Sequence, residues 1–457
     1  MFTRTLVFVL FCIPVFGQKL GYINQFIALD STGIFADVPI YPLINNTANT
    51  KNELIPLIDG LIRQNPHVSA KTNLGLLVNI EKPKWIFRFG GSVGAKSLHS
   101  SGFVNNQFTL YNSDIYALSA TPQCRLGFIP NKYFNAQFGF DRNFIGDGVR
   151  SLFLSDYSSP SPFASIRFNA GPLTYQMMGM YLQAVSYQKK YTVNHYVHWK
   201  LGTKFSINVF ESVVFNSRDS INNRNFEVAY LNPFVVLRPN EYALGSGDNV
   251  LMGGGFSFNS GRNKWYGQFI IDDLLIQSVL QKQKYWGNKI GILAGWKHLR
   301  SLLGGKFLFR MESSFIRPYT YSHIGSQLNY ANGLLPISHA LGANFWESFV
   351  RVDFIKHKVA CFMELSLGEK GIGAAYGGDI LAPYTLRPSD YGVVLLQGLK
   401  TNFVNFRINV GLSISENSRY QLFAELLSLY YKNSVTKNWN LSPILGFRTN
   451  LWNDYRI

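Results

Sequence analysis

Apolar and polar residues alternate in short segments along most of the chain. One of the clearest runs over 404–412, where the two faces read Val404, Phe406, Ile408, Val410, Leu412 and Asn405, Arg407, Asn409, Gly411. Shorter segments of this kind lie at 134–140, 164–170, 306–312 and 350–354, and residues 199–209 read as one more strand. Since successive side chains of a strand point to opposite faces, each segment predicts a strand with one apolar and one polar side.

Two all-β architectures fit such segments: a soluble sandwich and a transmembrane barrel. Strands of ~10 residues with aromatics near their ends are typical of the barrel. Polar faces that carry Lys204, Arg310 and Arg407 in mid-strand favour a wet interior, and closure pairs every backbone group, as lipid requires. Charged residues make up only 15%, against ~25% in soluble proteins. We therefore expect an outer-membrane β-barrel, with a large exported soluble β-protein as the alternative.

The chain length sets the size of the expected barrel. Its 457 residues provide roughly 16–20 antiparallel strands with their turns. A barrel of this width needs a filling unless it is an open pore. Residues 18–72 lack clear alternation, and 49–66 (NTKNELIPLIDGLIRQNP) fit a short helix interrupted near Pro56. We expect 18–72 to form a plug, a periplasmic cap or a simple lead-in, and 73–457 to form the barrel.

The first residues predict export. A cation at Arg4, an apolar stretch and small residues before Gln18 are typical of a cleaved signal peptide over residues 1–17. Beyond it no run approaches ~18 apolar residues, the length of a spanning helix. The net charge of +17 indicates anionic partners, such as the phosphates of outer-membrane lipid and lipopolysaccharide or an acidic polysaccharide. Nucleic acid is excluded as a partner because the chain is exported.

One internal segment, FDRNFIGDGVRSLFLSD (140–156), reads as neither helix nor strand. Its charged residues are Asp141, Arg142, Asp147, Arg150 and Asp156. An arginine facing lipid at the midplane of a barrel costs ~2–4 kcal/mol, so we expect the segment in the lumen. Its Asp and Arg side chains can brace one another, or bind the hydroxyls and carboxylates of a sugar.

With the following SPSPFASIRF, this segment resembles the signature of the Wzi-like capsule assembly family in its Bacteroidetes-type form. YLNPFVVLRPNEYALGSGDN (230–249) and PISHALGANFWESFVRVDF (336–354) are similar to two further family blocks. The resemblance implies an 18-stranded outer-membrane barrel with helical segments near its N-terminus. It also implies a lectin-like role in holding capsular or exopolysaccharide, acidic or neutral, at the cell surface. Some relatives are linked to gliding motility, so polysaccharide export or gliding and secretion machinery are the protein partners it implies.

The two further blocks add candidate ligand-binding residues. They are Arg238, Glu241, Asp248, Asn249, His339, Asn344 and Glu347. For these residues, as for the charges of 140–156, bracing of the barrel and contact with a glycan both remain open.

Catalytic and cofactor motifs are weak. Ser92 lies in a G-x-S-x-G match, but the residues after it do not predict the helix that this motif requires. His195 and His198 fall on opposite faces of a predicted strand, so a shared metal ion is not expected. We predict a protein that is not an enzyme and has no cofactor or metal. The alternatives to a polysaccharide anchor are an accessory protein of gliding or type IX-like secretion, a solute pore and a barrel enzyme.

Overall fold

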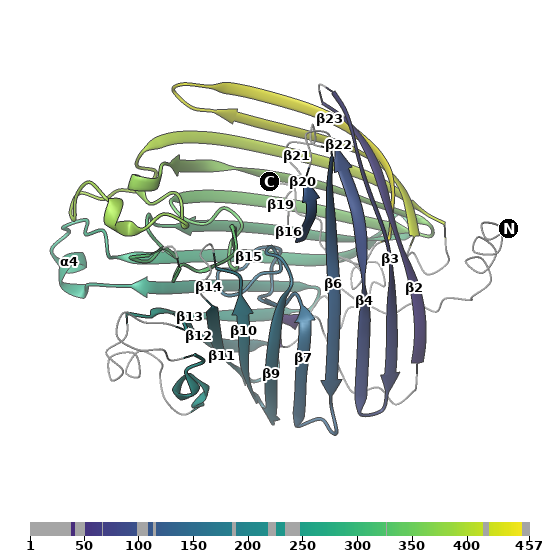
Figure 1. Cartoon of the computed structure of the whole chain (residues 1–457), viewed down its shortest axis with the longest axis horizontal. Coiled ribbons are helices and arrows are strands. Elements are labelled where there is room, and N and C mark those ends of the chain that lie inside the picture. Colours follow the sequence, from purple (N-terminus) through teal and green to yellow (C-terminus); the bar gives the residue numbers. More distant parts are fainter. Residues whose placement is uncertain are drawn as a thin grey trace.

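The computed structural model describes residues 38–41, 51–65, 67–97, 108–112, 116–184, 189–217, 225–233, 247–325, 327–414 and 420–449. They form a closed antiparallel barrel of 18 strands (Figure 1). The strands are β2 (Lys51–Asn65), β3 (His67–Lys82), β4 (Trp85–Ser97), β6 (Tyr116–Phe128), β7 (Phe134–Asp141), β9 (Ser161–Ala170), β10 (Leu173–Leu182), β11 (Lys190–Leu201), β12 (Phe205–Asn216), β13 (Asn249–Ser260), β14 (Asn263–Asp273), β15 (Lys289–Leu302), β16 (Gly305–Ile316), β19 (Phe345–Lys356), β20 (Val359–Ile372), β21 (Leu399–Ser413), β22 (Tyr420–Lys432) and β23 (Lys437–Thr449). The signal peptide predicted over 1–17 lies outside the described residues.

Smaller elements complete the described fold. A short strand, β5 (Phe108–Asn112), pairs with β6 beyond the point where β7 leaves it. Two small sheets pair β1 (Ile40–Tyr41) with β8 (Phe144–Ile145), and β17 (Ala331–Asn332) with β18 (Leu335–Pro336). The helical turns are η2 (Val228–Leu231), α4 (Ile276–Leu280), η3 (Ala374–Tyr376) and η4 (Tyr384–Leu386). No helix in the described part of the chain is long and apolar enough to cross a membrane.

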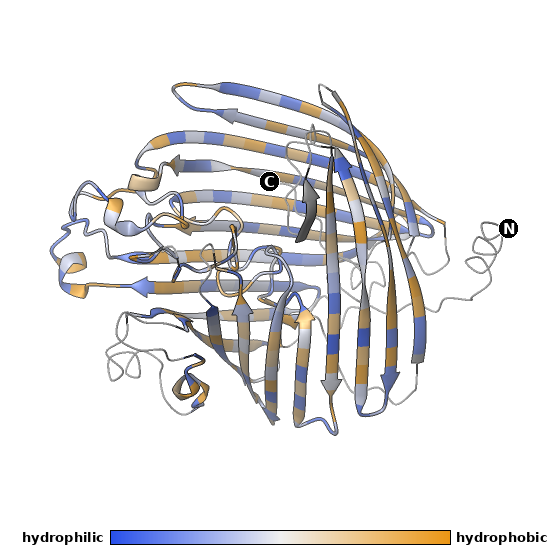
Figure 2. Ribbon diagram, in the orientation of Figure 1, coloured by the Kyte–Doolittle hydropathy of each residue, from blue (hydrophilic) through white to orange (hydrophobic). Residues whose placement is uncertain are grey.

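The predicted alternation is confirmed in the barrel wall. Along β21, Asn405, Arg407 and Asn409 are buried, whereas Val404 and Ile408 are exposed on the outer face. Figure 2 shows the same alternation of hydrophilic and hydrophobic positions on strand after strand. The outer face is therefore suited to lipid.

Residues 199–209 are not one strand, as the pattern predicted, but the end of β11, a turn at 202–204 and the start of β12. Trp199 pairs with Ile207 across this hairpin. Directly paired residues share a face of the sheet, so the apolar alternation continues through the turn without revealing it. Lys204 consequently lies exposed in the turn.

The helix considered for 49–66 is wrong, and so is the start of the barrel at residue 73. Residues 51–65 form β2, which pairs with β3 along its length and closes the barrel against β23 at Gly60–Arg63. Ile58 N donates to Thr449 Oγ1 on the β23 side, so the nitrogen of Pro56, two residues earlier, faces that side too. Among the described residues, β23 pairs with β2 only at Gly60–Arg63, so no ladder partner faces Pro56 on that side. A proline, which has no N–H to donate, is tolerated at such an unpaired strand edge.

The two ends of the barrel differ. Turns at 83–84, 129–133, 171–172, 202–204, 261–262, 303–304 and 357–358 make one end, which we call the short-turn end. The segments 142–160, 217–248, 274–288, 317–344 and 373–398 leave the other end, which we call the long-loop end. The segment 274–288, which contains α4, lies at the left of Figure 1. Transmembrane barrels place short turns in the periplasm and long loops outside the cell.

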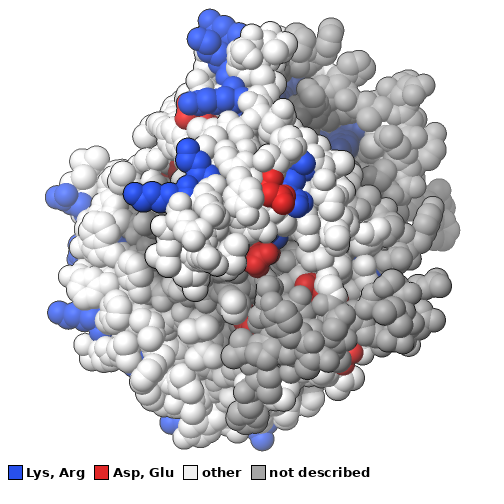
Figure 3. Space-filling model, turned by 90° about the vertical axis from the view of Figure 1, so that its left-hand side faces the viewer, with Lys and Arg blue, Asp and Glu red and all other residues white. Residues whose placement is uncertain are grey.

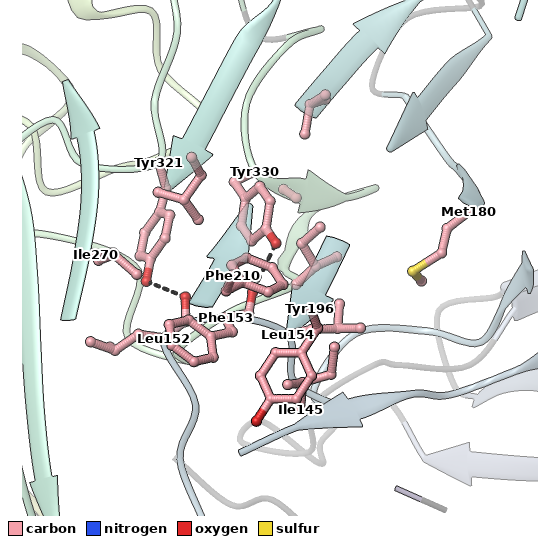
Figure 4. Packing of buried hydrophobic residues seen from close by; sticks show 14 of the residues in the cluster. Ile145, Leu152, Phe153, Leu154, Met180, Tyr196, Phe210, Ile270, Tyr321 and Tyr330 are labelled. Atoms are coloured by element: carbon pink, nitrogen blue, oxygen red, sulfur yellow. Dashed lines mark hydrogen bonds between the residues drawn. The ribbon is translucent and has the colours of Figure 1, made fainter. Parts of the chain in front are cut away.

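Residues 142–160, which we call the lumenal insert, leave the wall after β7 and rejoin it at β9. Leu152, Phe153 and Leu154 of the insert are buried in an apolar cluster with inward-facing wall residues such as Phe210 and Ile270 (Figure 4). The alternating pattern predicts only polar faces inside the barrel. The insert explains the difference, because it carries apolar side chains that the facing wall must bury.

Candidate functional site

The lumenal insert is fixed to the opposite wall by buried charges. Asp147 Oδ1 lies 2.5 Å from Lys264 Nζ on β14 and 3.6 Å from Lys297 Nζ on β15. Lys297 Nζ also donates to the Asp147 carbonyl at 3.0 Å. All three side chains are buried, so these ion pairs form away from solvent.

Glu312 on β16 binds the backbone of the insert. Its carboxylate accepts from Val149 N at 2.5 Å, from Arg150 N at 2.9 Å and from Tyr266 Oη at 2.9 Å. A Cβ on Gly148 would lie 2.7 Å from Glu312 Oε1, which explains why a residue without a side chain stands there. The glycine at 148 therefore fits the docking of this segment onto β16.

Arg150 of the insert and Glu347 of β19 form a second buried ion pair between the insert and the wall. Arg150 Nε and Nη2 donate to the two oxygens of Glu347 at 3.1 and 2.9 Å. Glu347 also accepts from Ser366 Oγ at 2.5 Å and lies 3.1 Å from His339 Nε2. The arginine lies over the Phe349 ring, 4.7 Å from its centroid. The structure thus brings three predicted candidates, Arg150, His339 and Glu347, into one buried cluster.

His339 makes this cluster sensitive to acid. Burial lowers the pKa of His339 below its ordinary value of about 6.5, despite the opposing charge of Glu347. Its Nδ1 accepts from Leu341 N at 3.2 Å, and protonation there would remove that acceptor. A histidine with a lowered pKa adds stability above roughly pH 6.5 that is lost as the pH falls through the folded pKa.

We expect the Leu341 amide to exchange with solvent faster at pH 5 than at pH 7, after correction for intrinsic rates. Hydrogen exchange followed by mass spectrometry measures this, and a His339→Asn variant should lose the dependence on pH. Equal protection of Leu341 at the two pH values would contradict the assignment.

At the other end of the insert, Asp141 accepts from Arg125 Nε at 2.8 Å and from Gln123 Nε2 at 3.0 Å. Arg142 Nε donates to the Ser158 carbonyl at 3.1 Å, and Asp156 is half-buried. The contacts of Asp141 hold the end of β7, where the insert begins, against β6.

Two tyrosines from the long loop 317–344 hold the centre of the insert. Tyr321 Oη donates to the Leu152 carbonyl at 2.9 Å, and Tyr330 Oη donates to the Phe153 carbonyl at 2.8 Å (Figure 4). The Phe153 ring stacks on Phe210 of β12 at 4.8 Å. The insert is therefore held by both the wall and an outer loop.

The remaining candidates fasten loops at the long-loop end. Asn344, at φ 60°, donates through Nδ2 to the carbonyls of Gly371 and Gln397, both at 3.0 Å. Asp248 accepts from Tyr230 Oη at 2.6 Å, and Asn249 Nδ2 donates to the Leu328 carbonyl at 2.9 Å. Arg238 and Glu241 lie outside the described residues. Each of the three described residues makes a bracing contact, and a role in glycan binding stays a prediction.

A second cluster, which the sequence analysis missed, lies at the long-loop end. We call it the outer aromatic patch, and its residues are Tyr285, Trp286, Tyr384, Arg387, Asp390 and Tyr391. The rings of Tyr285 and Tyr391 lie 5.6 Å apart, and those of Trp286 and Tyr384 lie 4.6 Å apart. The Arg387 guanidinium lies 4.0 Å from the Trp286 ring centroid and its Nε lies 2.7 Å from Asp390 Oδ1.

The outer aromatic patch is accessible. Tyr391 is 54% exposed and the side chain of Asp390 is 52% exposed, whereas Trp286 is buried beneath them. Exposed Lys282 and Lys284 precede Tyr285 in the same loop. Figure 3 views the molecule from this side, where the described surface carries scattered Lys and Arg and few Asp and Glu. Aromatic rings beside planar charged groups can bind a ligand that has both apolar faces and hydroxyl or carboxylate groups.

The other motifs take structural positions. Ser92 lies inside β4, paired with Gly75 and Thr121 of the neighbouring strands, and not on a turn between strand and helix. His195 binds the Tyr230 carbonyl through Nε2 at 2.9 Å and the Tyr175 hydroxyl through Nδ1 at 2.6 Å. In the described part of the chain, no group of three or more His, Cys, Asp or Glu side chains is placed to hold a metal ion.

No protein-family model and no curated protein sequence matches the chain. Among solved structures, it is similar to Wzi, an outer membrane protein involved in group 1 capsule assembly in Escherichia coli and a carbohydrate-binding β-barrel. That match has a TM-score of 0.58 at 12% identity and covers 95% of this chain and 89% of Wzi. The chain is also similar to Pseudomonas aeruginosa OprD (TM-score 0.46, 10% identity, 88% and 98% covered) and to OpdK with vanillate (TM-score 0.48, 8% identity, 88% and 99% covered). The chain therefore has the fold of an outer-membrane β-barrel.

Proposed function

We propose that this protein is a non-enzymatic, Wzi-like outer-membrane barrel that retains capsular or exopolysaccharide at the cell surface. The likeness of its fold to a carbohydrate-binding barrel supports this function. So does the resemblance of three sequence blocks to the Wzi-like family. The lumenal insert supports it as well, because a lumen occupied by a braced segment suits an anchor better than a channel for solutes.

The observation that carries the proposal is the outer aromatic patch. Sugar rings present apolar C–H faces that stack on aromatic side chains, here Tyr285 and Tyr391. Arg387 offers a planar fork of donors to carboxylates and hydroxyls, and Asp390 offers acceptors. The neighbouring Lys282 and Lys284 favour an acidic polysaccharide over a neutral one. Binding would be weak at each patch and strengthened by the many repeats of one polymer.

The test is retention of polysaccharide by living cells. In a strain lacking this gene, we expect the polysaccharide to be made but shed into the medium, and the unaltered gene to restore it to the cell surface. Complementation with Tyr285→Ala and Tyr391→Ala together should leave at least about half of it in the medium, since aromatic anchors dominate many binding surfaces. Tyr133→Ala, an exposed tyrosine at the short-turn end, is the matched control and should restore retention.

A gene deletion that leaves the cell-bound polysaccharide unchanged would exclude the anchoring role. The alternative is then an accessory protein for gliding or type IX-like secretion, which would co-purify with components of that machinery and bind no glycan.

A further inference from the structure

The short-turn end carries many cations on its surface. In the described turns and the strand residues beside them, the exposed ones are Lys82, Lys84, Lys132, Lys204, Arg262, Arg300, Lys356 and Lys358. They come from six hairpins, from β3–β4 to β19–β20, so they are distributed over much of the barrel circumference. We call this set the cationic rim.

Acidic side chains do not neutralise the cationic rim from the same turns. The turns at the short-turn end, over the residues that the structure describes, contain no Asp or Glu. The nearby acids Glu81 and Asp353 are buried and face the lumen, where Asp353 pairs with Arg310 and Arg351. The described part of the rim is therefore a positively charged surface without acidic residues in its turns, and such a surface attracts anions.

Aromatic side chains mark the level of the membrane surface just beside the rim. Trp85 contacts Phe128 at 4.4 Å between ring centroids, Trp265 contacts Trp296 at 5.8 Å, and Phe307 contacts Phe354 at 4.5 Å. Such belts lie at the headgroup level of barrels. Trp265 is 50% exposed, as expected for a ring that meets lipid.

Three cations of the rim stand at the edge of this belt on the outer face of the wall. Lys82 is paired with Trp85 across the β3–β4 hairpin, and Arg300 is paired with Phe307 across β15–β16. Lys356 follows Phe354 by two residues, on the same face of β19. Long basic side chains in this position extend away from the acyl chains toward the headgroups.

We propose that the cationic rim binds the phosphates of anionic phospholipids in the periplasmic leaflet of the outer membrane. A lipid surface fits the rim because the cations surround the wall, whereas an acidic protein would contact one side of it. Polybasic surfaces of this kind bind anionic lipid through the sum of several modest attractions. The inference rests on the fold and the short-turn end alone, independently of any glycan.

The experiment uses the full-length protein, purified in detergent and then supplied with phosphatidylglycerol or phosphatidylcholine of equal chain length. Bound lipid is counted by native mass spectrometry. We expect phosphatidylglycerol to be retained in preference, and the combined Lys82→Gln, Arg300→Gln and Lys356→Gln variant to lower its affinity by about tenfold or more. Lys432→Gln with Lys437→Gln, at the long-loop end, is the matched control and should keep the preference.

Heat-dependent migration on gels checks that each variant still forms a barrel. Equal retention of the two lipids by the unaltered protein, or an unchanged preference in the folded triple variant, would overturn the proposal. If the triple variant keeps its lipid preference but loses an acidic protein that co-purifies from cells, the rim is a protein-binding surface and the lipid assignment is wrong.

Discussion

Replacing Glu347 with alanine is expected to lower the free energy of unfolding by about 3–5 kcal/mol. Glu347 is 2% exposed and accepts hydrogen bonds from Nε and Nη2 of Arg150 and from the Ser366 hydroxyl. Without it, Arg150 remains buried and has lost the carboxylate that accepts from its Nε and Nη2. Urea unfolding of the protein in detergent micelles, followed by tryptophan fluorescence, measures the change.

Glu369 provides the matched control, because Glu369→Ala removes the same charge from β20 near the long-loop end. Its partner Lys400 is 54% exposed, and surface ion pairs contribute about 1 kcal/mol or less. A double variant, Arg150→Met with Glu347→Leu, should be more stable than Glu347→Ala because no unpaired charge is left. If Glu347→Ala destabilises the protein no more than Glu369→Ala does, the Arg150–Glu347 ion pair does not hold the insert.

Removing the lumenal insert is expected to open the barrel. Asp141 and Ser161 are directly paired across β7 and β9, so an Asn-Gly turn in place of residues 142–160 can join the two strands. The inward wall would then lose the segment that lies against β14, β15, β16 and β19. In planar lipid bilayers we expect the unaltered protein to conduct little, and the shortened protein to conduct at least about fivefold more, as an unfilled barrel of this width should.

A variant with Gly-Ser residues in place of α4 is the control, since this exposed helical turn lies in an outer loop and its loss leaves the lumen filled. Steady, high conductance of the unaltered protein would favour the solute pore considered from the sequence. Unchanged conductance after removal of 142–160 would show that other segments close the lumen.

The sequence predicted the barrel wall well because a local pattern encodes it. The faces of β21 follow from alternation alone, and the charges of 140–156 placed that segment in the lumen because lipid would not accept Arg142 or Arg150. The local pattern fails to predict the structure where the same residues fit more than one structure. Residues 51–65 lack strict alternation and contain a proline, which favours a short helix over the strand β2. A three-residue turn within 199–209 leaves the alternation intact.

The contacts within the sites could not be predicted, because they join residues that are far apart in the chain. Arg150 and Glu347 are separated by 197 positions, and nothing in either block specifies the pairing. The outer aromatic patch joins loops 274–288 and 373–398 in the same way. Its signal, tyrosines beside Arg387 and Asp390 in a segment without alternation, is visible only once the two loops are known to meet.

The most direct test of the account is binding of polysaccharide by the purified protein. An array of acidic and neutral bacterial polysaccharides is incubated with detergent-solubilised protein, unaltered or carrying Tyr285→Ala and Tyr391→Ala. We expect the unaltered protein to bind acidic polymers and the variant to bind them about tenfold more weakly, as loss of two aromatic anchors implies. Absence of binding to every polymer, or equal binding by the two proteins, would contradict the assignment of the long-loop end as a polysaccharide anchor.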